Sequence, residues 1–351
     1  MTNEQVGPYF DLVVERVVEE TPDAKSIVLK IPDELEDTFR YQPGQFLTFG
    51  VVVDGHQLVR CYSLASSPDT DQEYKVTIKR VEEGRASNYF NDHVPVGHSL
   101  KVMKPAGNFC LQSRSTPLFL FAGGSGITPV ISLIKSALVT TQRKVSLVYA
   151  NRDEKSVIFK QELDALAAAH SDRFDLHYRL DDADGFLDLG TARKQISGSA
   201  GADFYVCGPG AYMDVIEEAL AAEGVSAEAI FIERFLSPEL ESLDHPEPRV
   251  EGVEEEGAFT VSVYLDGNVT EVSVADGETV LEACHRVGLD APCACLEGYC
   301  GACMAMVKAG SVQMKLNDGG IDARQEADGW VLTCQGLVRS AGTRVEYPDA
   351  N

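Results

Sequence analysis

Four cysteines near the C-terminus constrain this chain more than any other feature. Three of them, Cys295, Cys300 and Cys303, fall in the run Cys-Leu-Glu-Gly-Tyr-Cys-Gly-Ala-Cys, and Cys334 follows further along the chain. The C-x4-C-x2-C…C spacing is one that holds a [2Fe–2S] cluster. Three thiolates must wrap a small inorganic core from one tight loop, and the two glycines of the run let the backbone approach the sulfides closely. We therefore predict these four cysteines as cluster ligands, in a protein that moves electrons one at a time.

Zinc and disulfide bonds are the alternative explanations for the cysteines. Structural zinc usually takes paired C-x2-4-C knuckles with a second pair well downstream, whereas here three cysteines share one loop and only one follows. The stretch from Met1 to Phe10 has neither the basic nor the apolar segment of an export signal. We therefore expect a cytoplasmic protein with reduced thiols. Cys293, two residues before Cys295, is a further thiol, and the downstream spacing favours Cys295 as the ligand.

Length and charge bound the class of protein. At 351 residues the chain suits two or three domains, and its hydrophobic fraction of 44% allows a packed core in each. No apolar run approaches the ~20 residues that a membrane span requires. Acidic residues number 55 against 30 basic ones, a net charge of −25. This excess disfavours nucleic acid and anionic membranes and would steer a partner with a basic docking face, although solubility alone explains it equally well.

A sharp change of composition divides the chain. Ser237 to Gly257 contains three prolines and the run Glu254-Glu255-Glu256, with almost nothing to bury. This composition is typical of an acidic, proline-stiffened linker. We predict the linker at residues 236–257 and a separate cysteine-rich domain at residues 258–351.

The segment after the linker has the pattern of a small α+β domain. We expect strands at Phe259 to Tyr264 and Val269 to Val274 joined by a turn at Asp266-Gly267, a helix from Thr279 to Val287 entered through Asp276, and later strands around Met304 to Val307 and Thr343 to Tyr347. With its cysteines in one loop, this β-grasp pattern resembles plant-type ferredoxins.

The first 113 residues carry the alternation of antiparallel strands: Tyr74, Val76 and Ile78 point one way, and Lys75, Thr77 and Lys79 point the other. Within them lies the run Arg60-Cys61-Tyr62-Ser63, which resembles the flavin-binding signature of the ferredoxin-NADP reductase superfamily. Arg60 suits a pyrophosphate, Tyr62 offers an aromatic face to the isoalloxazine, and Ser63 can hydrogen-bond near flavin N5.

A second run, Gly84-Arg85-Ala86-Ser87-Asn88-Tyr89, resembles the pyrophosphate loop of the same superfamily. Gly84 permits the turn, and Ser87 with nearby amides at a helix start suits phosphate. The resemblance implies an antiparallel β-barrel FAD domain at residues 1–113. The flavin-binding residues that it implies are Arg60, Cys61, Tyr62, Ser63, Thr77, Ile78, Lys79, Gly84, Ala86 and Ser87.

A nicotinamide-binding pattern follows at residues 114–235. An apolar strand from Pro117 to Ala122 runs into Gly123-Gly124-Ser125-Gly126-Ile127-Thr128-Pro129 and then into a helical stretch from Val130 to Leu138. Strand, glycine turn and helix form the phosphate cradle of dinucleotide folds. Further strands at Lys144 to Ala150 and Phe204 to Cys207, with an amphipathic helix between them, indicate an α/β domain with a parallel sheet. We expect Gly124, Ser125, Gly126, Thr128 and Pro129 to bind the coenzyme.

The ends of the last strands carry the remaining candidates. Cys207-Gly208-Pro209 closes a strand where ligands bind such sheets, and in the superfamily this motif lies beside the nicotinamide. Glu233 and Phe235 stand where related reductases have an acid and an aromatic near the flavin. The resemblance thus implies catalytic roles for Ser63, Cys207 and Glu233. After the second strand, Arg152 suits a 2′-phosphate while Asp153 and Glu154 would repel one, so the sequence favours NADH over NADPH.

The order of the three domains implies a mechanism. Over nearly its whole length the chain resembles the reductase components of 3-ketosteroid 9α-hydroxylase, with phenylacetyl-CoA epoxidase reductases as neighbours. The resemblance implies that NADH gives hydride to FAD and that single electrons leave through [2Fe–2S] to a Rieske-type terminal oxygenase. The alternatives are a reductase for a di-iron monooxygenase or desaturase, and a redox-sensing subunit.

Overall fold

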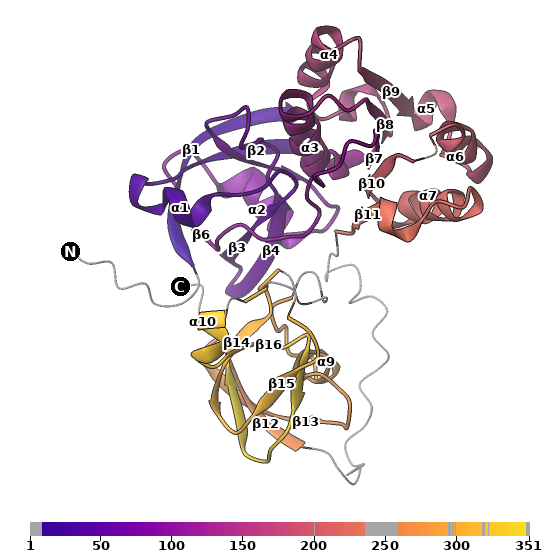
Figure 1. Cartoon of the computed structure of the whole chain (residues 1–351). Helices are drawn as coiled ribbons and strands as arrows, with labels where there is room; N and C mark the ends of the chain where they lie inside the picture. The colour runs from indigo at the N-terminus through magenta and orange to yellow at the C-terminus, as the bar shows by residue number, and fades with distance from the viewer. Residues whose placement is uncertain are drawn as a thin grey trace.

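The structure, a computed structural model, describes residues 9–199, 201–235, 259–293, 296, 298, 300–317, 320–321 and 323–348. The predicted linker at residues 236–257 and the predicted ligand Cys295 lie outside the described residues. The described chain forms three sheets that follow one another along the sequence and lie side by side in space (Figure 1).

The first sheet is antiparallel, in the strand order β4-β3-β6-β1-β2-β5. An isolated bridge between Leu64 and Val76 joins the end of β4 to β5, so the sheet curls toward closure. Lys75 and Thr77 of β5, on its polar side, are buried as well, because other parts of the chain cover that side. The elements are β1 (Phe10–Thr21), β2 (Ala24–Lys30), β3 (Phe46–Val53), β4 (His56–Ser63), β5 (Tyr74–Lys79), β6 (Ser99–Val102), η1 (Asp33–Leu35), α1 (Glu36–Phe39) and α2 (Arg85–His93).

The second sheet is parallel, in the order β11-β10-β7-β8-β9, with helices on both faces. Alternate strand residues pack against α3 and α4 on one face and against α6 and α7 on the other. The elements are β7 (Leu118–Gly123), η2 (Gly124–Gly126), α3 (Ile127–Thr140), β8 (Val145–Asn151), η3 (Glu154–Ser156), α4 (Lys160–Ala169), β9 (Phe174–Leu180), α5 (Asp181–Asp184), α6 (Leu189–Ile196), β10 (Asp203–Cys207), α7 (Gly210–Ala222), η4 (Ala227–Ala229) and β11 (Ile230–Glu233).

The third sheet has the order β13-β12-β18-β14-β16, with β15 and β17 paired beside it. The pairing of β12 with β18 is parallel and that of β12 with β13 antiparallel, which gives the expected β-grasp arrangement. The elements are β12 (Phe259–Leu265), β13 (Asn268–Val274), α9 (Val280–Arg286), β14 (Met304–Ala309), β15 (Val312–Met314), α10 (Ala323–Ala327), β16 (Trp330–Leu332), β17 (Gly336–Val338) and β18 (Thr343–Glu346).

The helix α9 begins within one residue of the expected start at Thr279, which is its N-cap. Asp276 is not the capping residue, because Thr279 and Glu282 form a reciprocal capping box that satisfies two backbone N–H groups. The turn at Asp266 and Gly267 is as expected, with φ of 52° and 76°.

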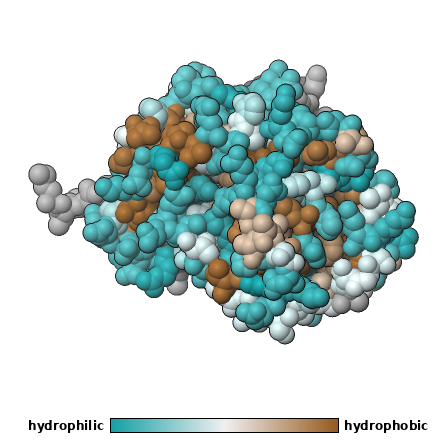
Figure 2. All heavy atoms as spheres, turned by 90° about the horizontal axis from the view of Figure 1, so that it is seen from above, coloured by the Kyte–Doolittle hydropathy of each residue, from teal (hydrophilic) through white to brown (hydrophobic). Residues whose placement is uncertain are grey.

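The surface agrees with the acidic composition. Hydrophilic residues predominate on the face shown in Figure 2, with apolar patches between them. In the described part of the chain, no helix has the length and apolar character to cross a membrane.

Candidate redox site

The glycine loop lies at the switch point of the parallel sheet. The chain leaves β7 toward β8 and later returns to β10 on the other side of β7, so the loops after β7 and β10 meet. A Cβ on Gly126 would stand 2.2 Å from the carbonyl oxygen of Cys207, and a Cβ on Gly208 would stand 3.0 Å from the backbone nitrogen of Gly123. Gly124 has a φ of 52°. The two predicted coenzyme motifs therefore form one cradle that side chains would fill, which fits a pyrophosphate.

The remaining loop residues support this cradle. Thr128 is buried and its hydroxyl donates to the carbonyl oxygen of Ser125 at 3.0 Å. Pro129 is buried in the first turn of α3, whereas Pro209 is exposed at the start of α7. Phe235 has an exposed fraction of 41%. The backbone amides of the glycine loop thus lie at the start of α3, which is the arrangement that binds phosphate.

The three predicted catalytic residues meet where the first two sheets adjoin. The hydroxyl of Ser63, at the end of β4, donates to Glu233 Oε2 at 3.3 Å. Glu233 on β11 pairs in register with Cys207 on β10. Burial raises the pKa of Glu233 from 4.5 to about 8, and burial beside Glu233 raises the pKa of Cys207 well above its ordinary value. This cluster therefore holds a carboxyl group that is protonated at neutral pH.

Sequence reasoning missed Cys110, which also lies near Glu233. Its thiol is buried, and burial together with the Glu233 carboxylate raises its pKa to about 11. Cys110 stands alone between the first two sheets, in no motif, so no sequence signal marked it.

The predicted flavin strand β4 presents two kinds of contact. Tyr62 packs against Phe90 and Phe49, with ring centroids 5.2 and 5.8 Å away, and Arg60 is half-buried with Nη1 donating to the carbonyl oxygen of Val59 at 2.9 Å. An aromatic face and a guanidinium on one strand fit the two halves of a dinucleotide.

The other predicted flavin residues lie on β5 and at the start of α2. The Thr77 hydroxyl contacts that of Ser26 at 2.7 Å, Ile78 is in the core, and Lys79 Nζ lies 3.8 Å from Asp23. Burial lowers the pKa of Lys79. Gly84 precedes α2, where Ala86 is buried.

Ser87 makes contacts within its own loop. Its hydroxyl accepts from the Val81 backbone nitrogen at 3.1 Å and donates to the Gly84 carbonyl oxygen at 3.4 Å. The hydroxyl thus braces the turn before α2, and the backbone amides are the groups left at the helix start for phosphate.

Three predicted cluster ligands converge. Cys300, Cys303 and Cys334 are buried, and Cys303 has a raised pKa because of a contact with Cys334, burial and the charges of Cys334 and Cys300. None of the eight cysteines that the structure describes forms a disulfide bond. Cys293 lies in the same core of the third sheet as Cys303 and Cys334, so burial alone does not separate it from the ligands. The donor set is sulfur only, which fits an iron–sulfur cluster.

The loop geometry also fits a cluster. Gly298 and Gly301 have φ of 83° and 73°, and a Cβ on Gly301 would stand 2.8 Å from the carbonyl oxygen of Gly320. The Ala302 backbone nitrogen donates to Cys300 Sγ at 3.4 Å. Among the residues the structure describes, no group of His, Cys, Asp or Glu has the spacing of a single-ion site.

The cluster loop packs on the first sheet. Cys300 and Ala302 contact a group formed by Phe46, Val59, Cys61 and Ala106, and the Thr48 hydroxyl donates to the Cys300 carbonyl oxygen at 3.4 Å. Met103 and Tyr9 belong to the core of the third sheet although they come from the N-terminal part of the chain. Cys61, expected to contact flavin, thus faces the cluster loop, since neighbours on a strand point to opposite sides.

Comparison with known families supports this arrangement. Residues 11–110 match the oxidoreductase FAD-binding domain, residues 120–218 the oxidoreductase NAD-binding domain, and residues 263–339 the 2Fe-2S iron-sulfur cluster binding domain.

Relatives match over nearly the full chain. The ferredoxin reductase component of 3-ketosteroid-9-alpha-monooxygenase from Rhodococcus rhodochrous is 42% identical over 96% of this chain and 96% of its own length. A component of the 1,2-phenylacetyl-CoA epoxidase from Escherichia coli K12 is 34% identical over 97% of this chain and 98% of its own length.

Solved structures share the fold. Phthalate dioxygenase reductase aligns with a TM-score of 0.58 at 22% identity, over 97% of this chain and 98% of its own. The FAD/NAD-binding domain of nitric oxide dioxygenase from Vibrio cholerae aligns with a TM-score of 0.57 at 29% identity, over 64% of this chain and 98% of its own.

Fold and site together define an oxidoreductase that uses FAD, NAD(H) and a [2Fe–2S] cluster. The chain belongs to the family of the oxygenase reductase components, among which the 3-ketosteroid-9-alpha-monooxygenase ferredoxin reductases are its relatives at 38–42% identity. The predicted fold class, enzyme class and cofactors are thereby confirmed.

Proposed function

We propose that this protein is an NADH-dependent reductase that supplies single electrons to a Rieske-type 3-ketosteroid 9α-hydroxylase. The observation that carries the proposal is the meeting of Ser63, Glu233 and Cys207 beside the glycine loop, in a chain whose cluster loop also contacts β4, through Val59 and Cys61. Bound FAD supplies the step from two-electron hydride chemistry to one-electron chemistry. The assignment of the steroid oxygenase rests on the identity with the Rhodococcus relative.

The proposed roles of the residues follow from their contacts. Glu233 holds a proton at its buried carboxyl group, and Ser63, which donates to that carboxyl group, stands ready to orient the reacting edge of the flavin. Cys207 and Gly208 shape the nicotinamide side of the cradle. Cys295, Cys300, Cys303 and Cys334 hold the cluster.

Coenzyme preference is proposed from an acidic corner beside Arg152. The Asp182 backbone nitrogen donates to the Arg152 carbonyl oxygen at 3.1 Å, so the acidic helix α5 adjoins the loop after β8. The Arg152 guanidinium pairs with Asp23 at 2.9 Å. Asp153 accepts from the Ser156 backbone nitrogen at 2.9 Å. A 2′-phosphate would meet Asp23, Asp153 and α5, which supports NADH over NADPH.

The function is tested by anaerobic titration of the purified protein with NADH and, separately, with NADPH, followed by visible absorbance. We expect NADH to bleach both the flavin and the iron–sulfur bands, and NADPH to do so far more slowly. Bleaching of the flavin alone would mean that the cluster is not coupled to it. No bleaching with either coenzyme would overturn the reductase proposal.

The partner is tested by reconstitution. We expect steroid hydroxylation with a Rieske-type 3-ketosteroid oxygenase, and slower transfer as salt screens the net charge of −25, if acidity steers a basic docking face. The epoxidase relative at 34% identity supports a di-iron partner as the second candidate. Turnover with a di-iron oxygenase and none with a Rieske partner would favour that candidate.

We propose that the protein is located in the cytoplasm. Thiolate ligands of iron require a reducing environment, and the eight described cysteines form no disulfide bond. Fractionation of the producing cell tests the location.

A further inference from the structure

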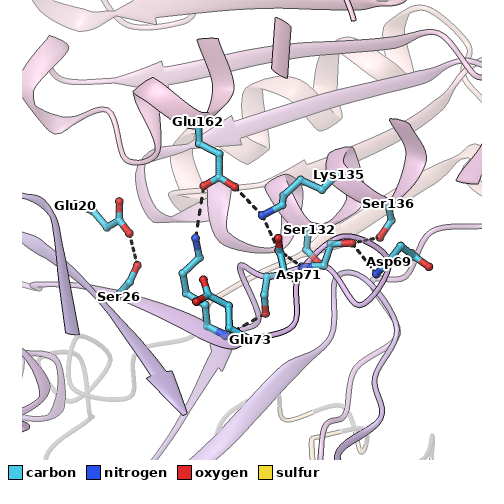
Figure 3. A network of polar contacts seen from close by, with 12 residues as sticks. Glu20, Ser26, Asp69, Asp71, Glu73, Ser132, Lys135, Ser136 and Glu162 are labelled. Carbon is cyan, nitrogen blue, oxygen red and sulfur yellow. Dashed lines mark hydrogen bonds and ion pairs between the residues drawn. The ribbon is translucent and has the colours of Figure 1, made fainter. Parts of the chain in front are cut away.

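A charged cluster with a buried lysine and two partly buried carboxylates joins the first two sheets. Lys135 of α3 places Nζ 2.6 Å from Asp71, in the loop between β4 and β5, and 2.6 Å from Glu162 of α4. The Lys135 side chain is 8% exposed. Figure 3 shows Lys135 pointing between these two carboxylates. One ammonium thus bridges the part of the chain that carries the flavin strand and the part that carries the coenzyme loop.

A second lysine approaches the same cluster from the flavin side. Lys75 of β5 lies 3.5 Å from Glu162, and its Nζ stands 4.9 Å from the centre of the Phe159 ring. Phe159 has a φ of 60°, a left-handed conformation that is unfavourable for a residue with a side chain. This backbone conformation costs conformational free energy. It places the Phe159 ring where the Lys75 ammonium can make a cation–π contact with it.

Neutral hydrogen bonds extend the contact along α3. The Ser132 hydroxyl donates to the Ser66 carbonyl oxygen at 2.6 Å, and the hydroxyls of Ser136 and Ser67 lie 2.7 Å apart. Positions 132, 135 and 136 lie on one face of a helix. A whole polar face of α3 is therefore buried against the loop that follows the flavin strand.

Stability alone is a poor explanation for this arrangement. Burial disfavours the charge on Lys135, and the hydrogen bonds to Asp71 and Glu162 outweigh that effect, so that its pKa is raised. A buried ion pair is commonly no more stabilising than apolar residues of the same size, but it fixes direction because its partners must align. This cluster is therefore suited to setting geometry.

The same helix leads to the coenzyme cradle. α3 begins at Ile127, directly after the glycine loop. The loop is tied a second time through Tyr149, whose hydroxyl donates to the Gly124 carbonyl oxygen at 2.9 Å and accepts from the Ile158 backbone nitrogen at 3.3 Å. Ile158 precedes Phe159. A shift of α3 or α4 against the first sheet would thus move the coenzyme cradle relative to Ser63.

We propose that Lys135, by bridging Asp71 and Glu162, is a positioning residue for hydride transfer. It fixes α3, whose first residue follows the glycine loop, against the loop after the flavin strand. The inference rests on the proposed function, because it presumes that NADH reduces the flavin of this protein.

The test compares Lys135→Met with Lys135→Arg and with the control Lys160→Met in the full-length holoenzyme. Lys160 lies on the same helix as Glu162, but its ammonium pairs with Asp164 at 2.9 Å and with Glu154 at 3.7 Å. Stopped-flow flavin reduction gives the limiting rate and the apparent NADH dissociation constant separately. We expect Lys135→Met to lower the limiting rate ~10- to 100-fold, because a misplacement of about 1 Å has effects of this size, while the dissociation constant changes less than about 3-fold.

Two further readouts separate positioning from folding. Amide hydrogen exchange should rise in residues 64–71 and 127–140 of Lys135→Met, with flavin content unchanged. Lys135→Arg should recover part of the rate, because it retains the charge, and Lys160→Met should match the wild type. If Lys135→Met does not retain flavin, Asp71→Asn, which keeps the shape of the bridge, serves as the second variant.

The outcomes are distinct. An unchanged limiting rate in Lys135→Met, or a parallel loss of rate and NADH affinity with early unfolding, would overturn the inference. Failure of NADH to reduce the wild-type flavin would instead overturn the proposed function.

Discussion

The first sheet has two neighbours, and it meets them through opposite chemistry. Against the parallel sheet it buries two lysines and four serines, and the lysines pair with the partly buried carboxylates of Asp71 and Glu162. Against the cluster loop it presents mainly apolar side chains, with Thr48 donating a long hydrogen bond. Hydride transfer needs the reacting atoms in contact and aligned, whereas an electron tunnels across a gap. The polar contact with the parallel sheet, which fixes direction, thus stands where hydride transfer needs alignment. The apolar contact with the cluster loop stands where electron transfer needs only proximity.

The largest expected effect is the loss of the cluster without any loss of flavin reduction. Cys334→Ser removes one of the four predicted cluster ligands, so we expect the iron–sulfur absorbance to disappear while NADH still reduces the flavin. Cys293→Ser is the matched control, because Cys293 lies in the same core as Cys334 but outside the C-x4-C-x2-C spacing, and it should keep the cluster. Visible spectra and stopped-flow reduction measure both. Loss of flavin reduction in Cys334→Ser would mean that the two interfaces are not independent.

The next effect concerns Glu233, which joins the first two sheets through Ser63. Burial raises the pKa of Glu233 from 4.5 to about 8, so folding favours the protonated carboxyl group. Its contribution to stability is fully present below pH 4.5 and is lost as the pH rises through 8. Glu233→Gln, which stays neutral, should remove about 2–4 kcal/mol of this pH dependence.

Urea unfolding of the two proteins at pH 5 and at about pH 8.5 measures this difference. We expect the wild type to lose stability relative to Glu233→Gln as the pH rises. If the unfolding free energies of the wild type and Glu233→Gln change with pH in the same way, Glu233 is ionised in the folded protein at neutral pH. The proposed proton-holding role would then be wrong.

A smaller effect is expected at the apolar interface. Met103 is 7% exposed and packs into the core of the third sheet, so Met103→Ala should weaken that contact by about 2 kcal/mol. We expect slower reduction of the cluster with an unchanged rate of flavin reduction. Met213→Ala is the control, because Met213 of α7 is buried in the core of the second sheet instead, and it should leave the ratio of the two rates unchanged. A slower flavin reduction in Met103→Ala would contradict the assignment of the apolar interface to electron transfer alone.

The smallest effect belongs to the surface pair between Arg85 and Asp290, which spans the same apolar interface at 3.3 Å. Both side chains are more than one third exposed, so solvent screens the pair and Asp290→Ala should change stability by less than about 1 kcal/mol. Thermal unfolding of the full chain at low and high salt measures it. A loss much above that value would mean that charge, and not apolar packing, holds the third sheet in place.

Short runs of sequence predicted most of the candidate site. The cysteine spacing, Arg60 to Ser63 and the glycine loop each carry their geometry in a few consecutive residues, because a turn or a strand end needs particular residue types at fixed offsets. The start of α9 was predicted within one residue, but Asp276 was taken as the entry residue because it stands three positions before Thr279, the residue that caps the helix. Cys110 was missed because it belongs to no such run.

What the sequence by itself determined is the set of local parts: three domains in order, the thiolates, the glycine cradle and the aromatic strand. Only the tertiary structure decided how the parts meet. Ser63 and Glu233 are separated by 170 positions, and Ser67 and Ser136 by 69. Such pairs depend on the packing of whole sheets and helices, and a lysine in the middle of an apolar helix gives no sign of the carboxylates that will surround it. The physical reason is that local conformation follows from neighbours in the chain, whereas the burial of a charge follows from the entire fold.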